Sequence, residues 1–432
     1  MNKKFIGVIL LALAFAAAFS ACKSKEKTAA PEAAAGFKPA LDTKTEASIN
    51  VAGHYSNFEA LEEEFNRFEA FYPNVKMTYT ALDSYNNNIA TALSGDEAPD
   101  IFFTYPTYIG KENYQAVFDA AEDLSDPKLN IDLSCVRESL IYKDAEGHIP
   151  MVPVFASTYG MLVNEKIFEK EKIAVPETLS QLISASEALQ KAGYTSPIMA
   201  HSSLLLYPMY FPYFCGTVMG NDAALADLNE LKEGSGEYMR SALELAADYM
   251  GRGFMDLESC DTLENDYQAV ILRFFEGDVP MMMASGGTVS GTEKRQSMSE
   301  AYTADPFTYS FRPVPSTEEG GYMLTTVSLE FSVNKNSKNL DMANEFMRFL
   351  VSTAELNRMA QGKRMLTPCT DMSYDGIYSA FGSLDASHVI NQSTLGLNDA
   401  ADVQVRRAGR KVSLGEMTVD EAVAAYGTLE EN

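Results

Sequence analysis

The residues of this chain that could do chemistry are aromatic and polar side chains that follow three expected strands. We expect these strands over residues 48–53, 75–80 and 100–103. The segments directly after them are His54-Tyr55-Ser56-Asn57, Leu82-Asp83-Ser84-Tyr85 and Thr104-Tyr105-Pro106. In a parallel α/β sheet, ligands bind beyond the carboxyl ends of the strands. These three segments are therefore candidates for a ligand site.

The sequence contains none of the short motifs that identify common catalytic or nucleotide-binding sites. It has no H-E-x-x-H, no P-loop, no G-x-S-x-G and no dinucleotide fingerprint after a strand. Its four histidines lie far apart in the sequence, at His54, His148, His201 and His388. The run Met281-Met282-Met283 is typical of a buried strand rather than of a metal or cofactor site. We therefore expect no metal and no cofactor, although two carboxylates on a cleft could still serve a glycosidase.

Five cysteines are spread widely along the chain. Beyond Cys22 they are Cys135, Cys215, Cys260 and Cys369. Because no two of them form a C-x-x-C pair, the spacing indicates neither a zinc site nor a disulfide-dense scaffold. Two disulfides outside the cytoplasm or isolated buried thiols both fit the pattern. The sequence leaves the disulfide state open.

The elements that must position the candidate residues alternate between strands and helices. A capping box formed by Ser56 and Glu59, followed by apolar residues at helical spacing, predicts a helix that ends before Pro73. We expect further helices over residues 85–93 and 339–356, and local bends in the tyrosine-rich segment Tyr207–Phe214. Strand and helix alternating at this pace indicate a parallel α/β sheet with right-handed crossovers.

The N-terminus reads as a processing signal. Lys3 and Lys4 precede an uncharged apolar stretch that ends in small residues just before Cys22. That order is typical of a secretion signal over residues 1–21, and its apolar run is too short for a membrane-spanning helix. The cysteine resembles the acylated residue of a bacterial lipobox, so Cys22 is the expected point of lipid attachment. Residues 22–45 are rich in Ala, Lys and Pro, which predicts a flexible linker.

The charge balance excludes one class of partner. The formal net charge is −26, or −28 once Lys3 and Lys4 leave with the signal. Nucleic acid is an unsuitable partner because a backbone binder needs a basic surface. The balance also disfavours strongly anionic ligands, unless one local basic pocket overrides it.

Five phrases of the sequence are similar to those of one protein family. They are Ala92–Phe102, Pro153–Phe168, Val175–Leu182, Phe275–Met282 and Ser332–Leu350. Their order, within about residues 48–429, resembles the extracellular solute-binding proteins of ABC import systems, the large family that includes the maltose-binding type. The chain departs from that family in having no tryptophan, a common sugar-stacking residue there.

The resemblance implies a periplasmic-binding-protein-like fold, in which two α/β lobes are joined by crossing segments around a ligand cleft. We expect lobe one at residues 46–155 and 312–365, and lobe two at residues 156–311 and 366–432. It further implies a monomer that closes on its solute, is held outside the cytoplasm at a bacterial membrane by its lipid, and hands the solute to the membrane subunits of an ABC permease.

Carbohydrate is the leading ligand class that the resemblance implies, ahead of polyol phosphates and peptides. A sugar suits aromatic platforms flanked by carboxylates, amides and exposed backbone groups. The expected ligand-binding residues are Tyr55, Asn57, Asp83, Tyr85, Tyr105, Ser157, Tyr159, Tyr207, Tyr210, Gly286 and Gly287, with Thr326 and Ser328 as weaker candidates. Two other functions stay open: a secreted carbohydrate-active enzyme and a surface lipoprotein that binds a macromolecule.

Overall fold

The computed structural model describes residues 36–199, 202–256 and 267–430. The expected signal, Cys22, most of the expected linker and Cys260 lie outside these ranges. Within them, Cys135, Cys215 and Cys369 are free thiols. None of the helices in these ranges is long and apolar enough to cross a membrane.

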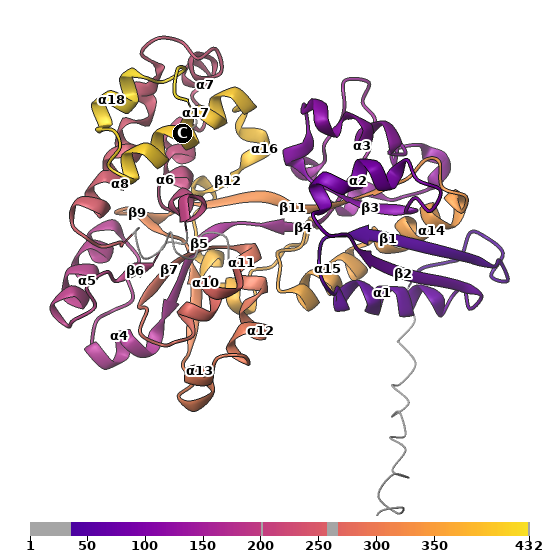
Figure 1. The fold of residues 1–432 in the computed structure, drawn as a ribbon, viewed down its shortest axis with the longest axis horizontal. Helices are drawn as coiled ribbons and strands as arrows, with labels where there is room; N and C mark the ends of the chain where they lie inside the picture. The colour runs from indigo at the N-terminus through magenta and orange to yellow at the C-terminus, as the bar shows by residue number, and fades with distance from the viewer. Residues whose placement is uncertain (1–35, 200–201, 257–266, 431–432) are drawn as a thin grey trace, which may run out of the picture.

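Two lobes of strands and helices lie side by side (Figure 1). Lobe one is built on β1 (Ala47–Gly53), which pairs in parallel with both β2 (Val75–Ala81) and β3 (Ile101–Thr104). These strands confirm the three that the sequence predicts. Its helices are α1 (Glu59–Glu69), α2 (Tyr85–Leu93), α3 (Gln115–Ala120), α14 (Leu340–Leu350) and α15 (Thr353–Lys363).

Two long strands connect the lobes. The strand β11 (Met323–Val333) runs antiparallel to β3 at one end and parallel to β12 (Val389–Asn391) at the other. The strand β4 (Val152–Ser157) pairs antiparallel with the middle of β11. Figure 1 shows both strands passing from one lobe to the other.

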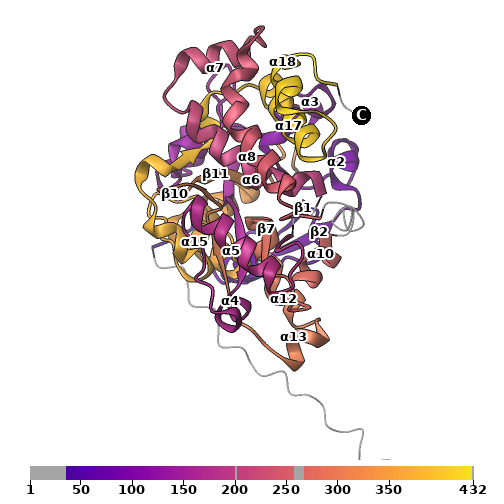
Figure 2. The ribbon, with the colours of Figure 1, turned by 90° about the vertical axis from the view of Figure 1, so that its left-hand side faces the viewer.

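Lobe two has a four-stranded sheet with the order β6-β7-β5-β8. Its strands are β5 (Tyr159–Asn164), β6 (Ile198–Met199), β7 (Met281–Ser285) and β8 (Tyr309–Arg312), with β9 (Pro315–Thr317) and β10 (Gly320–Gly321) as a separate ribbon. Its helices are α4 (Glu165–Glu171), α5 (Leu179–Lys191), α6 (Ser202–Val218), α7 (Asp222–Asn229), α8 (Arg240–Gly251), α10 (Tyr267–Phe274), α11 (Gly286–Ser290), α12 (Thr292–Gln296), α13 (Glu300–Ala304), α16 (Gln392–Leu395), α17 (Asp399–Ser413) and α18 (Val419–Ala424). The helices α6, α8 and α17 pack against one another, as the turned view in Figure 2 shows.

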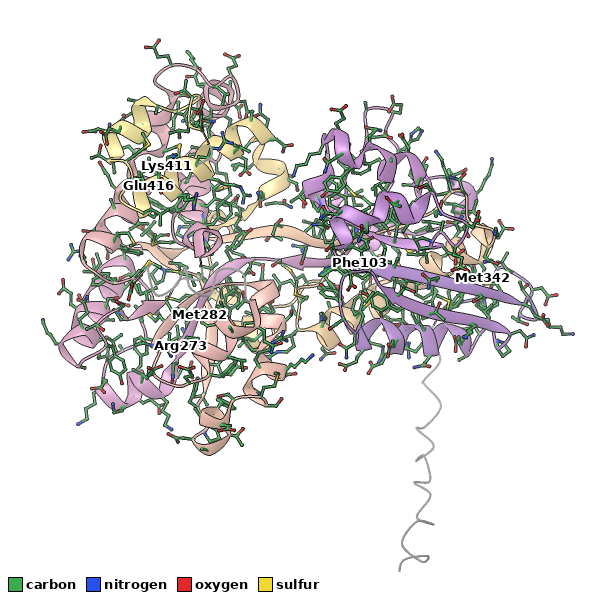
Figure 3. All side chains as sticks on the ribbon, viewed as in Figure 1. Phe103, Arg273, Met282, Met342, Lys411 and Glu416 are labelled. Carbon is green, nitrogen blue, oxygen red and sulfur yellow. The ribbon has the colours of Figure 1, made fainter. Side chains whose placement is uncertain are left out.

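Separate apolar cores fill the two lobes. Phe103 and Met342 are buried in the core of lobe one, and Met282 is buried in lobe two (Figure 3). The methionine run is therefore a buried strand, as predicted.

Apart from Leu140 and Cys369, which pack in the core of the opposite lobe, core membership passes from one lobe to the other at three places along the chain. It passes from Phe155 to Ala156, and it changes again between Leu324 and Leu329. It changes a third time from Met365 to Leu366, although Cys369 still packs in lobe one. We propose that the chain crosses from one lobe to the other at these three places. This proposal keeps the predicted lobe boundaries at residues 155 and 365. It moves the boundary predicted at residue 312 to beyond Leu324.

Two expectations about helix ends are wrong. The helix α1 begins at Glu59 with Phe58 in the cap position and no side-chain cap, so Ser56 and Glu59 do not form the predicted capping box. The Glu59 carboxylate accepts a hydrogen bond from Asn57 Nδ2 at 2.9 Å instead. The single helix expected over residues 339–356 is two helices, α14 and α15, because Ser352 Oγ accepts the backbone N–H of Glu355 and starts a new helix.

The bends expected in Tyr207–Phe214 are also wrong, because this segment is helical. Both Pro208 and Pro212 lie inside α6. A proline in a helix removes a hydrogen bond and disfavours the helix by about 3 kcal/mol. The helix persists because residues on it, such as Phe211 and Phe214, are fully buried among the helices of lobe two, and that burial offsets the loss.

Candidate functional site

A cavity of about 850 Å³ lies between the two lobes. Lobe one contributes the loop after β1, the first residue of α1, and Tyr105 after β3. Lobe two contributes α11, α12 and Ile271 of α10. The connecting strand β11 adds Ser328, and the end of α15 adds Gly362, Lys363 and Arg364. We call this cavity the cleft. Because its walls come from both lobes and from the connections between them, it changes shape whenever the lobes move.

The lobe-one wall is set by the close packing of β1 against β3. A side-chain Cβ at Gly53 would lie 2.3 Å from the ring of Phe103, so only glycine fits at the end of β1. The chain then turns outward into His54 and Tyr55, while Tyr105 leaves the neighbouring strand beside them. This arrangement brings residues of two loops to one edge of the sheet.

A hydrogen bond joins the two loops of the lobe-one wall. The hydroxyl of Tyr105 lies 2.5 Å from Nδ1 of His54. Burial and the nearby charge of Lys363 lower the pKa of His54 to about 4, so its imidazole is neutral at pH 7. Burial raises the pKa of the Tyr105 hydroxyl, which keeps its proton. We therefore assign Tyr105 as the donor and Nδ1 of His54 as the acceptor.

The lobe-two wall begins with a tight helix start. Ser285 and Thr288 form a capping box at the beginning of α11. A Cβ at Gly286 would lie 2.4 Å from Oγ of Ser157, so the glycine lets α11 approach the end of β4 closely. The next residue, Gly287, lines the cleft.

Basic side chains line the cleft from two directions. Lys294 and Arg295 come from α12, and Lys363 and Arg364 come from the end of α15. Arg364 forms an ion pair with Glu293 at 3.1 Å. The ammonium of Lys363 lies 4.2 Å from the centre of the Tyr55 ring, over its face. The cleft can therefore offer donors and positive charge as well as ring surface.

These features match a known family of binding proteins. Residues 52–356 match the family model for bacterial extracellular solute-binding proteins. The chain belongs to this family. No curated protein matches the chain in sequence.

Solved structures share the fold at low sequence identity. One comes from work on xylan utilization by the thermophilic bacterium Caldanaerobius polysaccharolyticus, with a TM-score of 0.67, 18% identity, and coverage of 88% of this chain and 99% of that one. The apo-form of RafE from Streptococcus pneumoniae has a TM-score of 0.66 at 16% identity, covering 89% and 97%. The GacH receptor of Streptomyces glaucescens, also solved with acarbose, has a TM-score of 0.66 at 16% identity, covering 89% and 97%. These likenesses confirm the predicted two-lobe α/β fold of this solute-binding protein.

Part of the expected ligand set lies at the cleft of this solute-binding protein. Four of the expected residues line it directly: Tyr55, Asn57, Tyr105 and Gly287, together with the weaker candidate Ser328. Asp83 and Tyr85 line an adjoining cavity of about 680 Å³ in lobe one, which shares His54 and Tyr105 with the cleft. Tyr85 is itself buried and donates its hydroxyl hydrogen bond to the carbonyl of Phe103 at 2.8 Å. That contact gives Tyr85 a structural role in this conformation.

The other five expected residues are not part of the lining of the cleft. Ser157, Tyr159, Tyr207, Tyr210 and Gly286 line neither of these two cavities. The ring of Tyr207 is stacked on Phe211, with 4.0 Å between centroids, and the guanidinium of Arg406 lies 4.1 Å from the ring centre. Tyr210 is buried and donates to the carbonyl of Arg406. The packing of α6 against α17 holds both tyrosines in lobe two, and a ligand role for this group stays a prediction.

Sequence reasoning missed the basic residues of the cleft. They form two Lys-Arg pairs, Lys294-Arg295 and Lys363-Arg364. Two such pairs in a chain of net charge −26 were a signal of a local basic site. Nothing in the sequence placed the pairs next to each other, because the contact between α12 and the end of α15 depends on how the lobes are joined.

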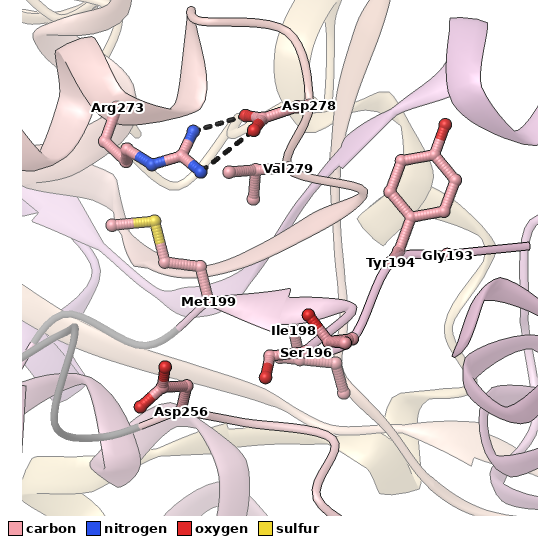
Figure 4. A pocket seen from close by; sticks show the side chains of 10 residues that line it. Gly193, Tyr194, Ser196, Ile198, Met199, Asp256, Arg273, Asp278 and Val279 are labelled. Carbon is pink, nitrogen blue, oxygen red and sulfur yellow. Dashed lines mark hydrogen bonds and ion pairs between the residues drawn. The ribbon is translucent and has the colours of Figure 1, made fainter.

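Two further features lie away from the cleft. A cavity of about 390 Å³ in lobe two, beside β6, is lined by Tyr194, Met199 and the ion-paired Arg273 and Asp278 (Figure 4). On an exposed turn of lobe one, Asp144, Glu146 and His148 offer ligand atoms within 4.8 Å of one another. There the Asp144 carboxylate already accepts the backbone N–H groups of Glu146 and His148, which explains the turn without an ion.

Proposed function

We propose that this solute-binding protein is an extracytoplasmic receptor that binds a sugar or oligosaccharide in the cleft and delivers it to an ABC import permease. The observation that carries the proposal is a cleft whose walls come from both lobes and from the segments that join them. A ligand in such a cleft touches both lobes at once and favours the closed arrangement by its extra contacts there. A permease can then distinguish a loaded receptor from an empty one.

The composition of the cleft supports a polyhydroxylated ligand. Its volume of about 850 Å³ falls within the range of about 300–1,000 Å³ that small-molecule sites occupy. Tyr105 offers aromatic surface, and Asn57, Glu59 and Ser290 offer amide, carboxylate and hydroxyl groups around it. Among the structural neighbours, RafE was solved with raffinose and another is a chitin oligosaccharide binding protein.

Membrane attachment through Cys22 is part of the same proposal. A lipid-anchored receptor on a flexible linker stays at high effective concentration beside its permease. The mass of the mature N-terminal peptide tests this step. An acylated Cys22 supports the anchor, whereas cleavage without acylation would leave an ordinary secreted protein.

Thermal unfolding in the presence of candidate ligands tests the binding function. Mono- and oligosaccharides are added at millimolar concentration, and a ligand present at 100 times its Kd stabilises the folded state by about 2.7 kcal/mol. The same mixtures are analysed for products. Saturable stabilisation without products supports a receptor. Cleavage of an oligosaccharide would instead identify a carbohydrate-active enzyme, and affinity for macromolecules alone would identify a surface lipoprotein that binds a macromolecule.

A pair of tyrosine variants locates the site. We expect Tyr105→Ala to weaken the binding of any ligand found by about tenfold or more, because the lost ring and hydroxyl both face the cleft. The matched control is Tyr238→Ala, because Tyr238 is 37% exposed and belongs to a turn before α8 in lobe two. Titration calorimetry measures both affinities. Equal losses in the two variants would argue against the cleft as the binding site.

A further inference from the structure

The cleft carries an excess of basic over acidic side chains although the whole chain is strongly acidic. Its lining includes Lys294, Arg295, Lys363 and Arg364, against the carboxylates of Glu59 and Glu293. The formal net charge of the chain is −26. Like charges gathered in a partly desolvated cavity repel one another, so this cluster costs free energy in the empty protein.

Only one of the four cations is neutralised by an ion pair. Arg364 is held by Glu293 at 3.1 Å and also donates to Oγ1 of Thr292 at 3.1 Å. Within the described ranges, no carboxylate forms an ion pair with Lys294, Arg295 or Lys363. Three positive charges therefore line the cleft without an ion-paired carboxylate in the part of the chain that the structure describes.

Two details show that the charges of these cations are poorly compensated in the empty protein. The Nε of Arg295 is buried and has no hydrogen-bond acceptor among the described residues. A buried donor left in this state is costly, and such donors usually meet a partner. Burial lowers the pKa of Lys363, and repulsion from Arg295 and Lys294 lowers it further, against the opposing effect of Glu59.

The aromatic surface of the cleft is reduced by the same lysine. Lys363 lies over the ring of Tyr55, at 4.2 Å from its centre, where a neutral sugar ring would otherwise stack. The chain has no tryptophan to replace that platform. The other tyrosine that lines the cleft, Tyr105, is partly buried against the core of lobe one. The recognition chemistry of the cleft is thus weighted toward charge rather than stacking.

We infer that the cleft binds a sugar that carries a negatively charged group: a carboxylate, a sulfate or a phosphate. This inference rests on the proposed receptor function and narrows its substrate class. The anionic group neutralises Lys363, Lys294 and Arg295, while Tyr105 and the polar groups contact the rest of the sugar. Charge-assisted hydrogen bonds of this kind are roughly twice as strong as neutral ones.

Matched pairs of neutral and charged sugars test the inference. The probes are trigalacturonate against galactotriose, glucose 6-phosphate against glucose, and a sulfated disaccharide against its unsulfated form, with inorganic phosphate and sulfate alone as further arms. Calorimetry is performed at low and at moderate salt. We expect at least one charged sugar to bind tenfold or more tightly than its neutral counterpart, and its affinity to fall as salt is added.

Variants connect the preference to the basic cluster. We expect Lys363→Gln and Lys294→Gln each to weaken binding of the charged sugar about tenfold and to change that of a neutral sugar less than threefold. Glu59→Gln removes a negative charge from the cleft wall and should strengthen binding of the charged sugar. The matched control is Lys191→Gln, because Lys191 is exposed and, like Lys363, is the last residue of its helix. Melting temperatures of the empty variants verify that each one folds.

The binding measurements separate failure of the inference from failure of the receptor function. A neutral sugar that binds as tightly as its charged partner, with no loss in Lys363→Gln, would overturn the inference and leave the receptor function standing. Phosphate or sulfate binding as tightly as the charged sugar would make the cleft a simple anion site and also overturn it. If no sugar of either kind binds, the receptor function itself fails.

Discussion

At the scale of single residues, the contact between Gly286 and Ser157 determines how closely the lobe-two wall approaches the connecting strand. Ser157 is the last residue of β4 and is buried, and Gly286 is the first residue of α11. The backbone N–H of Gly286 donates to the carbonyl of Thr158 at 2.9 Å. Any side chain at position 286 must enter the space that Ser157 Oγ already fills.

We therefore expect Gly286→Ala to destabilise the protein by about 1–3 kcal/mol through overpacking. The double variant Gly286→Ala with Ser157→Ala should recover most of that loss, because the new Cβ lies 2.4 Å from Ser157 Oγ but 3.3 Å from its Cβ. Urea unfolding measures the three free energies. Gly251→Ala is the control, since nothing lies within 4 Å of its Cβ position. If the change in the free energy of unfolding of the double variant equals the sum of the changes in the two single variants, the assigned contact between positions 286 and 157 is contradicted.

The residues that line the cleft were only partly predictable from the sequence. Tyr55, Asn57 and Tyr105 could be found because each follows a strand of the parallel sheet, and topology alone brings such loops together. Lys294 and Lys363 could not be placed, because their proximity depends on packing between α12 and the end of α15. Tyr207 has the ring that a sugar site needs but is buried in lobe two, because the packing of its helix depends on contacts between distant segments.

At the scale of elements, serine and threonine caps start two helices in different ways. Thr418 and Glu421 form the capping box of α18. Ser352 and Glu355 have the same spacing, but the Glu355 carboxylate is taken by Arg67, which donates two hydrogen bonds of 2.8 Å to it. The start of α15 was missed because the amphipathic pattern continues across the break between α14 and α15.

The cap at Ser352 can be measured directly. We expect Ser352→Ala to lower the free energy of unfolding by about 1 kcal/mol, because the backbone N–H of Glu355 loses its acceptor. Ser352→Asp keeps an acceptor at the same place and should retain most of the stability. Thermal unfolding of both variants compares them. A loss of the same size in Ser352→Asp would show that the hydroxyl acts in some way other than as a cap.

The connecting strand β11 contains a buried carboxyl group. Glu330 is 1% exposed, lies opposite Thr104 of β3, and one of its oxygens has no hydrogen-bond partner among the described residues. Burial raises its pKa to about 8, so the group is mostly protonated in the folded protein at pH 7. In the unfolded chain a glutamate ionises near pH 4.5. The folded state therefore holds an extra proton between these two values, and its stability falls as the pH rises through that window.

We expect Glu330→Gln to remove this pH dependence, because glutamine keeps the shape of the side chain and cannot ionise. Near pH 5 the free energy of unfolding of the variant should lie closer to that of the wild type. Near pH 9 it should exceed that of the wild type by on the order of a few kcal/mol. Urea unfolding at the two pH values measures the difference. Glu63→Gln, at an exposed position on α1, serves as the control. If Glu330→Gln stabilises the protein no more at pH 9 than at pH 5, the Glu330 carboxyl group is already ionised in the folded protein.

At the scale of the whole molecule, hydrogen bonds join the three proposed crossing segments to one another. The strands β4 and β11 pair along their length, and the N–H of Ala156 donates to the carbonyl of Leu366 at 2.8 Å. Paired strands of this kind resist sliding of one lobe along the other, whereas bending of the connecting segments changes the angle between the lobes. The two-lobe organisation was predictable from the order of the five sequence segments that resemble the family. The position of the second proposed crossing was not, because it depends on which of the two lobe cores each residue of β11 packs into.

Closure of the lobes is the motion that the proposed function requires, and small-angle X-ray scattering can observe it. Tryptophan fluorescence cannot, since the chain has no tryptophan. Because the empty protein has two lobes, we expect its radius of gyration to exceed the roughly 21 Å of a single compact domain of this length. A saturating ligand should reduce it by drawing the lobes together, whereas Tyr105→Ala at the same ligand concentration should respond less. A ligand that binds tightly in calorimetry and leaves the radius of gyration unchanged would argue against hinge closure, and the cleft would then act as a rigid site.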